Sequence, residues 1–179
     1  MLQIDDTALV IVDVQGKLAK IMHESEALLT QLEKLIQGVK VLGIPVVWLE
    51  QYPKGLEPTD EKIAQHLTEE EPISKMVFSA YASEEFLTQL RGLDRKQLLV
   101  AGIESHICVY QTVAELLESG NEVEVVVDGV SSRTLANKEI GIEKMKSLGA
   151  NVTSVEMALY ELMETAKHPK FKEVSNLIK

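Results

Sequence analysis

Short apolar runs alternate with amphipathic stripes along most of the sequence. Residues 7–12 (TALVIV) form a continuous β-branched run, which is typical of a strand buried on both faces of a sheet. Between residues 25 and 42, apolar side chains recur every three or four positions, which predicts an amphipathic helix, and Gly43 stands where its C-terminal cap belongs.

The same patterns predict the remaining elements. Further strands are expected at residues 44–49, 97–101, 123–127 and 151–155, with a brief extended segment at 75–78. Residues 50–60 are expected to form a loop, because they hold two prolines and a glycine. Further helices are expected up to about residue 67, at 84–91, 108–118 and 134–148, and on both sides of the turn at His168-Pro169.

This regular alternation predicts the fold class. Parallel strands need crossover connections, and alternating strands and helices supply them. We therefore expect an α/β protein, a three-layer α/β/α sandwich around a mostly parallel, about six-stranded, Rossmann-like sheet. No break in composition divides the chain, so residues 1–179 are expected to form one domain.

Sheets of this kind bind ligands beyond the carboxyl ends of their strands, near the point where the strand order reverses. The residues that follow the predicted strands are therefore candidates for a site. They are Asp13, Glu50, the turn at 102–108 and Asp128.

Charge and composition narrow the class of protein. The 179 residues include 18 Lys and Arg against 28 Asp and Glu, a formal net charge of −10. Such a surface repels nucleic-acid phosphates, and the densest basic stretch, at residues 91–96, is too short to form a binding patch. No apolar run approaches the ~20 residues that cross a bilayer, so no membrane partner is expected.

The single cysteine, Cys108, excludes an intramolecular disulfide and indicates a reducing compartment. The start of the chain also lacks the basic and apolar regions of a secretory signal. We therefore expect a cytoplasmic enzyme or small-molecule binder.

Metal and phosphate motifs are missing from the sequence. The four histidines, at positions 23, 66, 106 and 168, include no close pair at ligand spacing. The glycines at 38 and 43 lack the Lys-Ser/Thr ending of a P-loop, and no Gly-x-Gly-x-x-Gly follows the first strand. No metal or cofactor is expected.

The sequence supports two interpretations of the role of Cys108. At the start of helix 108–118, free N–H groups and the helix dipole would stabilise a thiolate, which suits a nucleophile. The alternative is a buried small hydrophobe, a common fate of cysteine.

Two charged residues in apolar surroundings complete a possible set. Asp13 ends a buried strand, where desolvation would raise its pKa towards that of a useful base, although a turn or cap aspartate is the alternative. Lys75 stands among apolar residues and could balance the charge of a thiolate and a carboxylate, whereas alone it would be a surface lysine. Together, Asp13, Lys75 and Cys108 form a base, cation and nucleophile.

Several segments carry a family resemblance. They are residues 50–56 (EQYPKGL), Phe78-Ser79, 131–133 (SSR) and 168–173 (HPKFKE), together with Asp13-Val14-Gln15 and the turn before Cys108. Over nearly the whole chain, the sequence resembles the isochorismatase-like cysteine hydrolases, and within them the isochorismatase domain-containing protein branch.

The resemblance implies site residues and an assembly. It implies that Asp13, Lys75 and Cys108 are catalytic and that the Ile103–Glu104 peptide bond is cis. It further implies an oxyanion hole made of the backbone N–H groups of Glu104 and Cys108. Dimers or larger homo-oligomers are expected on the same ground.

Two departures from the wider superfamily shape the expected reaction. The histidines of the nicotinamidase metal site are missing from residues 50–55, and Cys108 is present although hydrolases of the isochorismate vinyl ether often lack a cysteine. We expect hydrolysis of a small-molecule amide-type C–N bond through a thioester on Cys108.

Other functions and pocket residues stay open at this stage. Gln15, Tyr52 and Phe78 are candidate pocket residues, whereas Trp48 is expected in the core. The alternatives are a redox- or ligand-sensing protein that uses Cys108 without hydrolysis, a non-catalytic scaffold, and vinyl ether hydrolysis of the isochorismate type.

Overall fold

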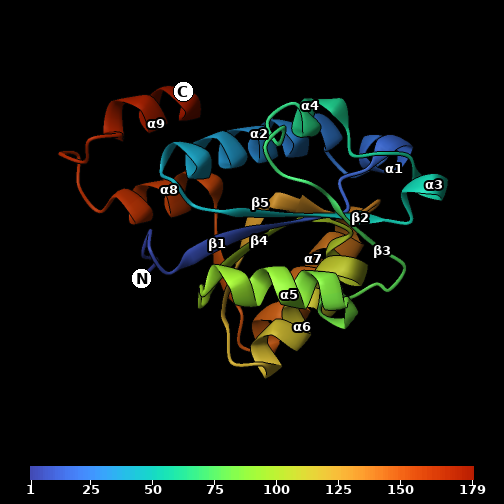
Figure 1. Cartoon of the computed structure of the whole chain (residues 1–179). Coiled ribbons are helices and arrows are strands. Elements are labelled where there is room, and N and C mark those ends of the chain that lie inside the picture. The colour runs from blue at the N-terminus through green and yellow to red at the C-terminus, as the bar shows by residue number, and fades with distance from the viewer.

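A computed structural model describes all residues, 1–179. Its centre is a six-stranded sheet with the strand order β3-β2-β1-β4-β5-β6, in which every neighbouring pair is parallel (Figure 1). The strands are β1 (Thr7–Val12), β2 (Val46–Gln51), β3 (Ile73–Lys75), β4 (Gln97–Ile103), β5 (Glu122–Ser131) and β6 (Asn151–Thr153).

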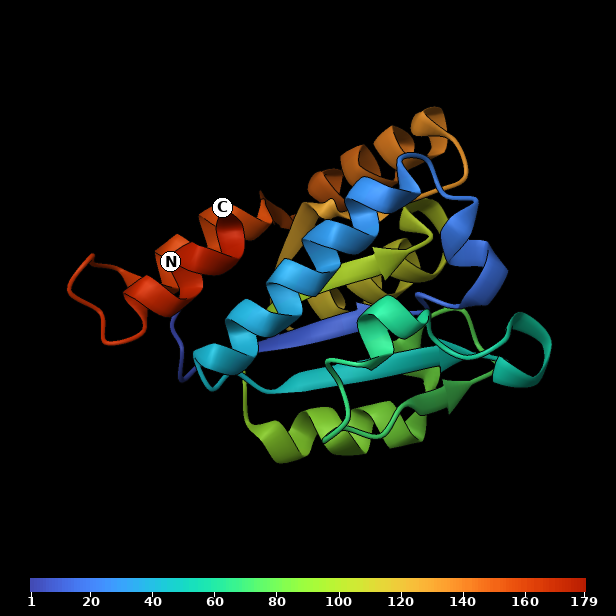
Figure 2. The same ribbon diagram turned by 90° about the horizontal axis from the view of Figure 1, so that it is seen from above.

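Helices cover both faces of this sheet, so the expected three-layer α/β/α architecture is confirmed (Figures 1 and 2). One layer comprises α1 (Gly16–Lys20), α2 (Ser25–Val41), α4 (Glu61–Ala64), α8 (Val155–Met163) and α9 (Phe171–Ile178). The other comprises α5 (Glu84–Leu93), α6 (Tyr110–Glu118) and α7 (Leu135–Ser147). The remaining helical segments are α3 (Pro53–Leu56), the 3₁₀ turn η1 (Ala80–Ala82) and the π-helical turn η2 (Ser105–Val109).

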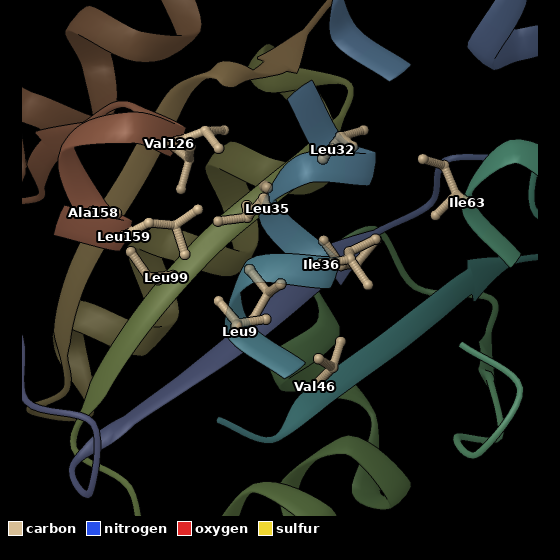
Figure 3. Close-up of a cluster of buried hydrophobic side chains, with 14 of the residues drawn as sticks. Leu9, Leu32, Leu35, Ile36, Val46, Ile63, Leu99, Val126, Ala158 and Leu159 are labelled. Atoms are coloured by element: carbon tan, nitrogen blue, oxygen red, sulfur yellow. The ribbon is translucent and has the colours of Figure 1, made fainter. Parts of the chain in front are cut away.

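The continuous apolar strands explain the two helical layers. Every residue of β1 is buried, and successive side chains point to opposite faces of the sheet. Leu9 and Ile11 therefore join the core under α2 and α8, whereas Ala8 and Val10 join the core under α5 and α6. Figure 3 shows the first core, where Leu32, Leu35 and Ile36 of α2 lie over Leu9 and Leu99.

The pattern of apolar residues predicted most helices and strands close to their observed positions, and it missed others. β2 begins two residues later than expected, because Pro45 has no N–H for the ladder and only its carbonyl accepts a bond from Leu9 N (2.9 Å). β5 runs on to Ser131, past the expected end at residue 127. The short helix α3 lies in the segment expected to be a loop, and the π-helical turn η2 precedes α6 where a single helix 108–118 was expected.

The strand order reverses between β1 and β4, which places a ligand-binding edge beside these two strands. The strands approach closely at Gly102, whose φ is +117° and where an added Cβ would lie 2.1 Å from the carbonyl oxygen of Val12. Only glycine permits this contact without a backbone shift. No helix of the chain is long and apolar enough to cross a bilayer.

Candidate active site

Asp13 directly follows β1 at the reversal of strand order. Its backbone is left-handed, with φ +52°, a conformation that aspartate tolerates better than most residues. Its N–H donates to Leu49 O of β2 (3.2 Å), and its side chain is 3% exposed. The carboxylate is therefore fixed in a dry place at the carboxyl ends of the strands.

Lys75 ends β3 and reaches across β2 to this carboxylate. Its Nζ donates to Asp13 Oδ2 (2.7 Å) and to Gln51 Oε1 (2.8 Å), and the carbonyl oxygens of Val77 and Phe78 lie 3.3 and 3.1 Å away. Lys75 is 3% exposed, so the alternative of a surface lysine is wrong. Four acceptors surround an ammonium that has three protons, which fixes its position.

Cys108 lies within the turn η2, after β4 and before α6, and is buried. Burial raises the pKa of its thiol to about 12, and the nearby Asp13 carboxylate contributes to the rise. The expectation of a thiolate stabilised by the start of a helix is thus wrong for the resting protein. At neutral pH the thiol keeps its proton.

The Asp13 carboxylate is paired with Lys75 and lines the same cavity as the Cys108 thiol. Its pKa is raised by burial, while the charge of Lys75 and the hydrogen bond from Lys75 oppose that rise. Oδ2 accepts from Lys75, whereas Oδ1 has no nitrogen or oxygen donor. This leaves Oδ1 as the acceptor available to the thiol proton, the arrangement expected of a general base.

The turn after β4 carries the candidate oxyanion donors. The Ile103–Glu104 peptide bond is cis, and the Glu104 N–H makes no hydrogen bond within the protein. The Glu104 carbonyl accepts from the N–H groups of Ile107 (3.0 Å) and Val109 (3.2 Å), which defines the path of the backbone around Cys108. The Glu104 carboxylate accepts from Arg133 N and Nε, both at 3.1 Å.

A cavity of about 110 Å³ opens in front of these groups. Asp13, Cys108, Glu104 and Phe78 line it, so the structure brings four of the sequence-predicted residues to one place. The rest of its wall consists of Leu18, Gln51, Leu56, Ile103 and Ile107.

Two predicted pocket residues lie outside the cavity wall. Gln15 is fully buried and holds the loops together: its Nε2 donates to Gln51 O (3.0 Å) and Glu57 O (2.8 Å), and its Oε1 accepts from Gln51 N (2.7 Å). Tyr52 is about half exposed, with a left-handed backbone at the start of α3. Gln15 thus supports the wall of the cavity without facing it.

The other strand-end candidates have structural roles. Glu50 Oε1 accepts from both the N–H and the hydroxyl of Thr59, and Trp48 Nε1 donates to the same hydroxyl from the core (2.8 Å). Asp128 lies inside β5 and accepts from Val155 N at the start of α8 (2.9 Å). The prediction of Trp48 in the core is confirmed, and Asp128 is not part of the cavity.

Sequence reasoning missed Gln51, which both lines the cavity and holds Lys75. Gln51 could have been found from its position at the end of a strand. The predicted strand ended at residue 49, two residues early, so Glu50 was named as the strand-end candidate instead. In the structure, Gln51 and Lys75 are register partners in β2 and β3. The structure contains no cluster of three or more His, Cys, Asp or Glu side chains placed to hold a metal ion.

Fold and site together define a class of protein. The isochorismatase domain matches residues 7–157, and the chain belongs to the isochorismatase family. An isochorismatase domain-containing protein 1 from Salmo salar is 37% identical over 150 residues, which are 82% of this chain and 52% of that protein. The chain thus spans about half the length of this relative.

Two further relatives cover nearly the whole chain. A secreted isochorismatase effector, Isc1, from Phytophthora sojae is 34% identical over 177 residues, 97% of this chain and 84% of the effector. A solved structure described as the MAR1 ribonuclease of Caenorhabditis elegans is 36% identical and superposes with a TM-score of 0.93, covering 99% of this chain and 91% of that one.

Proposed function

We propose that this protein is a cysteine hydrolase that cleaves an amide-type C–N bond of a small molecule through a thioester on Cys108. One observation carries the proposal. Lys75 holds one oxygen of the Asp13 carboxylate, the other oxygen has no hydrogen-bond partner, and Asp13 and Cys108 line the same cavity. A nucleophile, its base and a group that orients the base are the elements of covalent catalysis.

The reaction begins with a protonated thiol and an ionised Asp13. As Sγ of Cys108 forms a bond to the substrate carbonyl carbon, the thiol proton passes to Asp13, and the negative charge moves to the carbonyl oxygen. The N–H of Glu104, which has no acceptor in the protein, and that of Cys108 are proposed to bind this oxygen. Asp13 then protonates the leaving nitrogen as the C–N bond breaks.

Release of the product needs water as the second substrate. Asp13, again ionised, takes a proton from water as the water oxygen attacks the thioester carbon. The C–S bond breaks, the acid product leaves, and the proton returns to Sγ. Throughout these steps Lys75 keeps Oδ1 directed to the proton in transit, because its Nζ holds Oδ2.

RNA hydrolysis, suggested by the description of the Caenorhabditis elegans relative, is a poorer fit to this site. The chain carries a net charge of −10, and the cavity wall presents no lysine or arginine to a phosphate. Cleavage of RNA by the purified protein, lost in Cys108→Ser, would favour that activity over the amidase proposed here.

The direct experiment is a panel of small amides assayed for ammonia or amine release. Wild type, Cys108→Ser and Asp13→Asn are compared, with Ser74→Ala as a control at an exposed position of the neighbouring strand. We expect turnover by wild type and the control, a loss of about 10²–10⁴-fold in Asp13→Asn, and none in Cys108→Ser. Unchanged turnover in both site variants would exclude the mechanism.

A homo-oligomer is part of the proposal. Leu135, Ile140 and Leu148 expose large apolar side chains on and just after α7, and we expect a second copy of the chain to cover some of them. Sedimentation equilibrium of the purified chain tests this, and a monomer at micromolar concentration would exclude it.

A further inference from the structure

The wall of the active-site cavity is mostly apolar, although the chain is strongly acidic. Its five aliphatic and aromatic side chains come from five separate segments of the chain. Leu18 belongs to α1, Leu56 to α3, Ile103 to β4 and Ile107 to η2, and Phe78 follows β3. Apolar groups converging from separate segments form a binding surface for an apolar ligand.

The charged groups at this wall already have partners. Asp13 is paired with Lys75, whose side chain lies behind the wall and is fully buried. Glu104 is paired with Arg133, which does not line the cavity. The cavity therefore offers no free cation to an anionic ligand, and both charged side chains on its wall are carboxylates.

The cavity is also small. Its volume of about 110 Å³ is less than that of the ~150 Å³ apolar cavity known to admit benzene. Typical sites for drug-sized ligands measure about 300–1,000 Å³. A short acyl chain matches this space better than a larger ring or a branched chain does.

Resting on the proposed function, we infer that the protein acts on amides of short, uncharged, apolar acyl groups and excludes substrates whose acyl part carries a carboxylate. A carboxylate in this cavity would lose its hydration, meet no cation and face Asp13 and Glu104, and an unpaired buried charge is costly. The same cost applies to isochorismate, a vinyl ether that carries two carboxylates. Leu56 lines the cavity from α3, which has no buried residue, so it is the wall residue at which a size rule is best tested.

Alkylation of Cys108 tests the charge rule without requiring turnover. Iodoacetamide and iodoacetate attack the same sulfur and differ in the charge that enters the cavity. Rates for each are measured by mass spectrometry at one pH and divided by the rates with glutathione. We expect the normalised rate of iodoacetamide to exceed that of iodoacetate by at least about tenfold. Normalised rates that are equal, or higher for iodoacetate, would overturn the inference.

Substrate series test the size rule. Straight-chain neutral amides of increasing length are compared with carboxylate-bearing amides of matched length, using wild type, Leu56→Ala and, as a control, Met157→Ala at an exposed position of α8 that does not line the cavity. We expect Leu56→Ala to move the optimum of kcat/KM to longer chains and Met157→Ala to leave it unchanged. A wild-type preference for the anionic series would overturn the inference while supporting the proposed hydrolase. If no amide is cleaved, the proposed function fails, and the alkylation ratio still decides the charge rule.

Discussion

Nζ of Lys75 lies 2.7 Å from Oδ2 of Asp13, and the two residues are 62 positions apart in the sequence. Both side chains are buried, so each charge in the protein interior is stabilised by the opposite charge of its partner. A buried ion pair adds little net stability when compared with apolar residues, but removing one partner leaves a costly unpaired charge.

The pair predicts a characteristic pattern of stability. Lys75→Met should lower the free energy of unfolding by about 3–5 kcal/mol, because it leaves the Asp13 carboxylate buried without a cation. Adding Asp13→Asn to Lys75→Met should restore at least about 1 kcal/mol of that loss. Urea denaturation of the two single variants and the double variant gives these values. Strictly additive losses would show that the two side chains are not coupled.

Activity should depend on pH through Asp13. Burial raises the pKa of this carboxyl, and only its ionised form can take the thiol proton. As pH falls through that raised pKa, kcat/KM should fall, at a higher pH than the usual ~3.9 of aspartate would give. At alkaline pH the rate should stay level, because the pKa of Cys108 is about 12. A profile that instead rises near pH 8.5 would point to a preformed thiolate as the active species.

Cys108 should be a slow thiol in the absence of substrate. With its pKa at about 12, very little thiolate exists at pH 7. Oxidation by hydrogen peroxide should therefore be at least about tenfold slower than that of glutathione, as followed by trapping of the sulfenic acid. Faster oxidation than glutathione, without hydrolase activity, would favour the redox-sensing alternative.

The turn that carries Cys108 depends on Gly141 of α7. A Cβ at this position would lie 2.6 Å from the backbone carbonyl carbon and oxygen of Ser105 and 2.8 Å from His106 N. Gly141→Ala should thus displace η2 and lower kcat/KM by about tenfold or more, since misplacement of a catalytic group by 1 Å can cost about 10² in rate.

Gly92→Ala is the matched control, because a Cβ there meets nothing within 4 Å and the residue also lies in a helix. It should leave activity unchanged and stabilise the fold by up to about 1 kcal/mol. Equal activity of the two variants would show that η2 tolerates the shift.

The sequence predicted the architecture because its strands are apolar on both faces and its helices on one. The same logic placed Asp13 and Cys108 together, since β1 and β4 are neighbours whose carboxyl ends share an edge of the sheet. Lys75 could be predicted as a site residue only because it completes a base, cation and nucleophile with Asp13 and Cys108, and because the family resemblance implies it. Nothing in its surroundings distinguishes it from an exposed lysine before the strand register is known.

Long-range hydrogen bonds account for most of what the sequence did not predict. The side chain of Gln15 forms hydrogen bonds with backbone groups 36 and 42 residues away, and no local sequence pattern indicates such bonds. The sequence therefore predicted that Gln15 faces the substrate, whereas it supports the wall of the cavity. The raised pKa of the thiol depends on burial of Cys108 beside a carboxylate, a property of the folded interior. The position of the cysteine along the chain indicated a helix dipole, and the fold placed the residue in a π-helical turn instead.

The short helix α3 has an evolutionary consequence. It contributes Leu56 to the cavity, yet none of its residues is buried, and neither hydrophobic core includes them. Substitutions at such a position change stability little, usually within about 0.5 kcal/mol. Descendants of this protein could therefore acquire new substrates by drift in α3 while the sheet, the ion pair and the nucleophile are inherited unchanged.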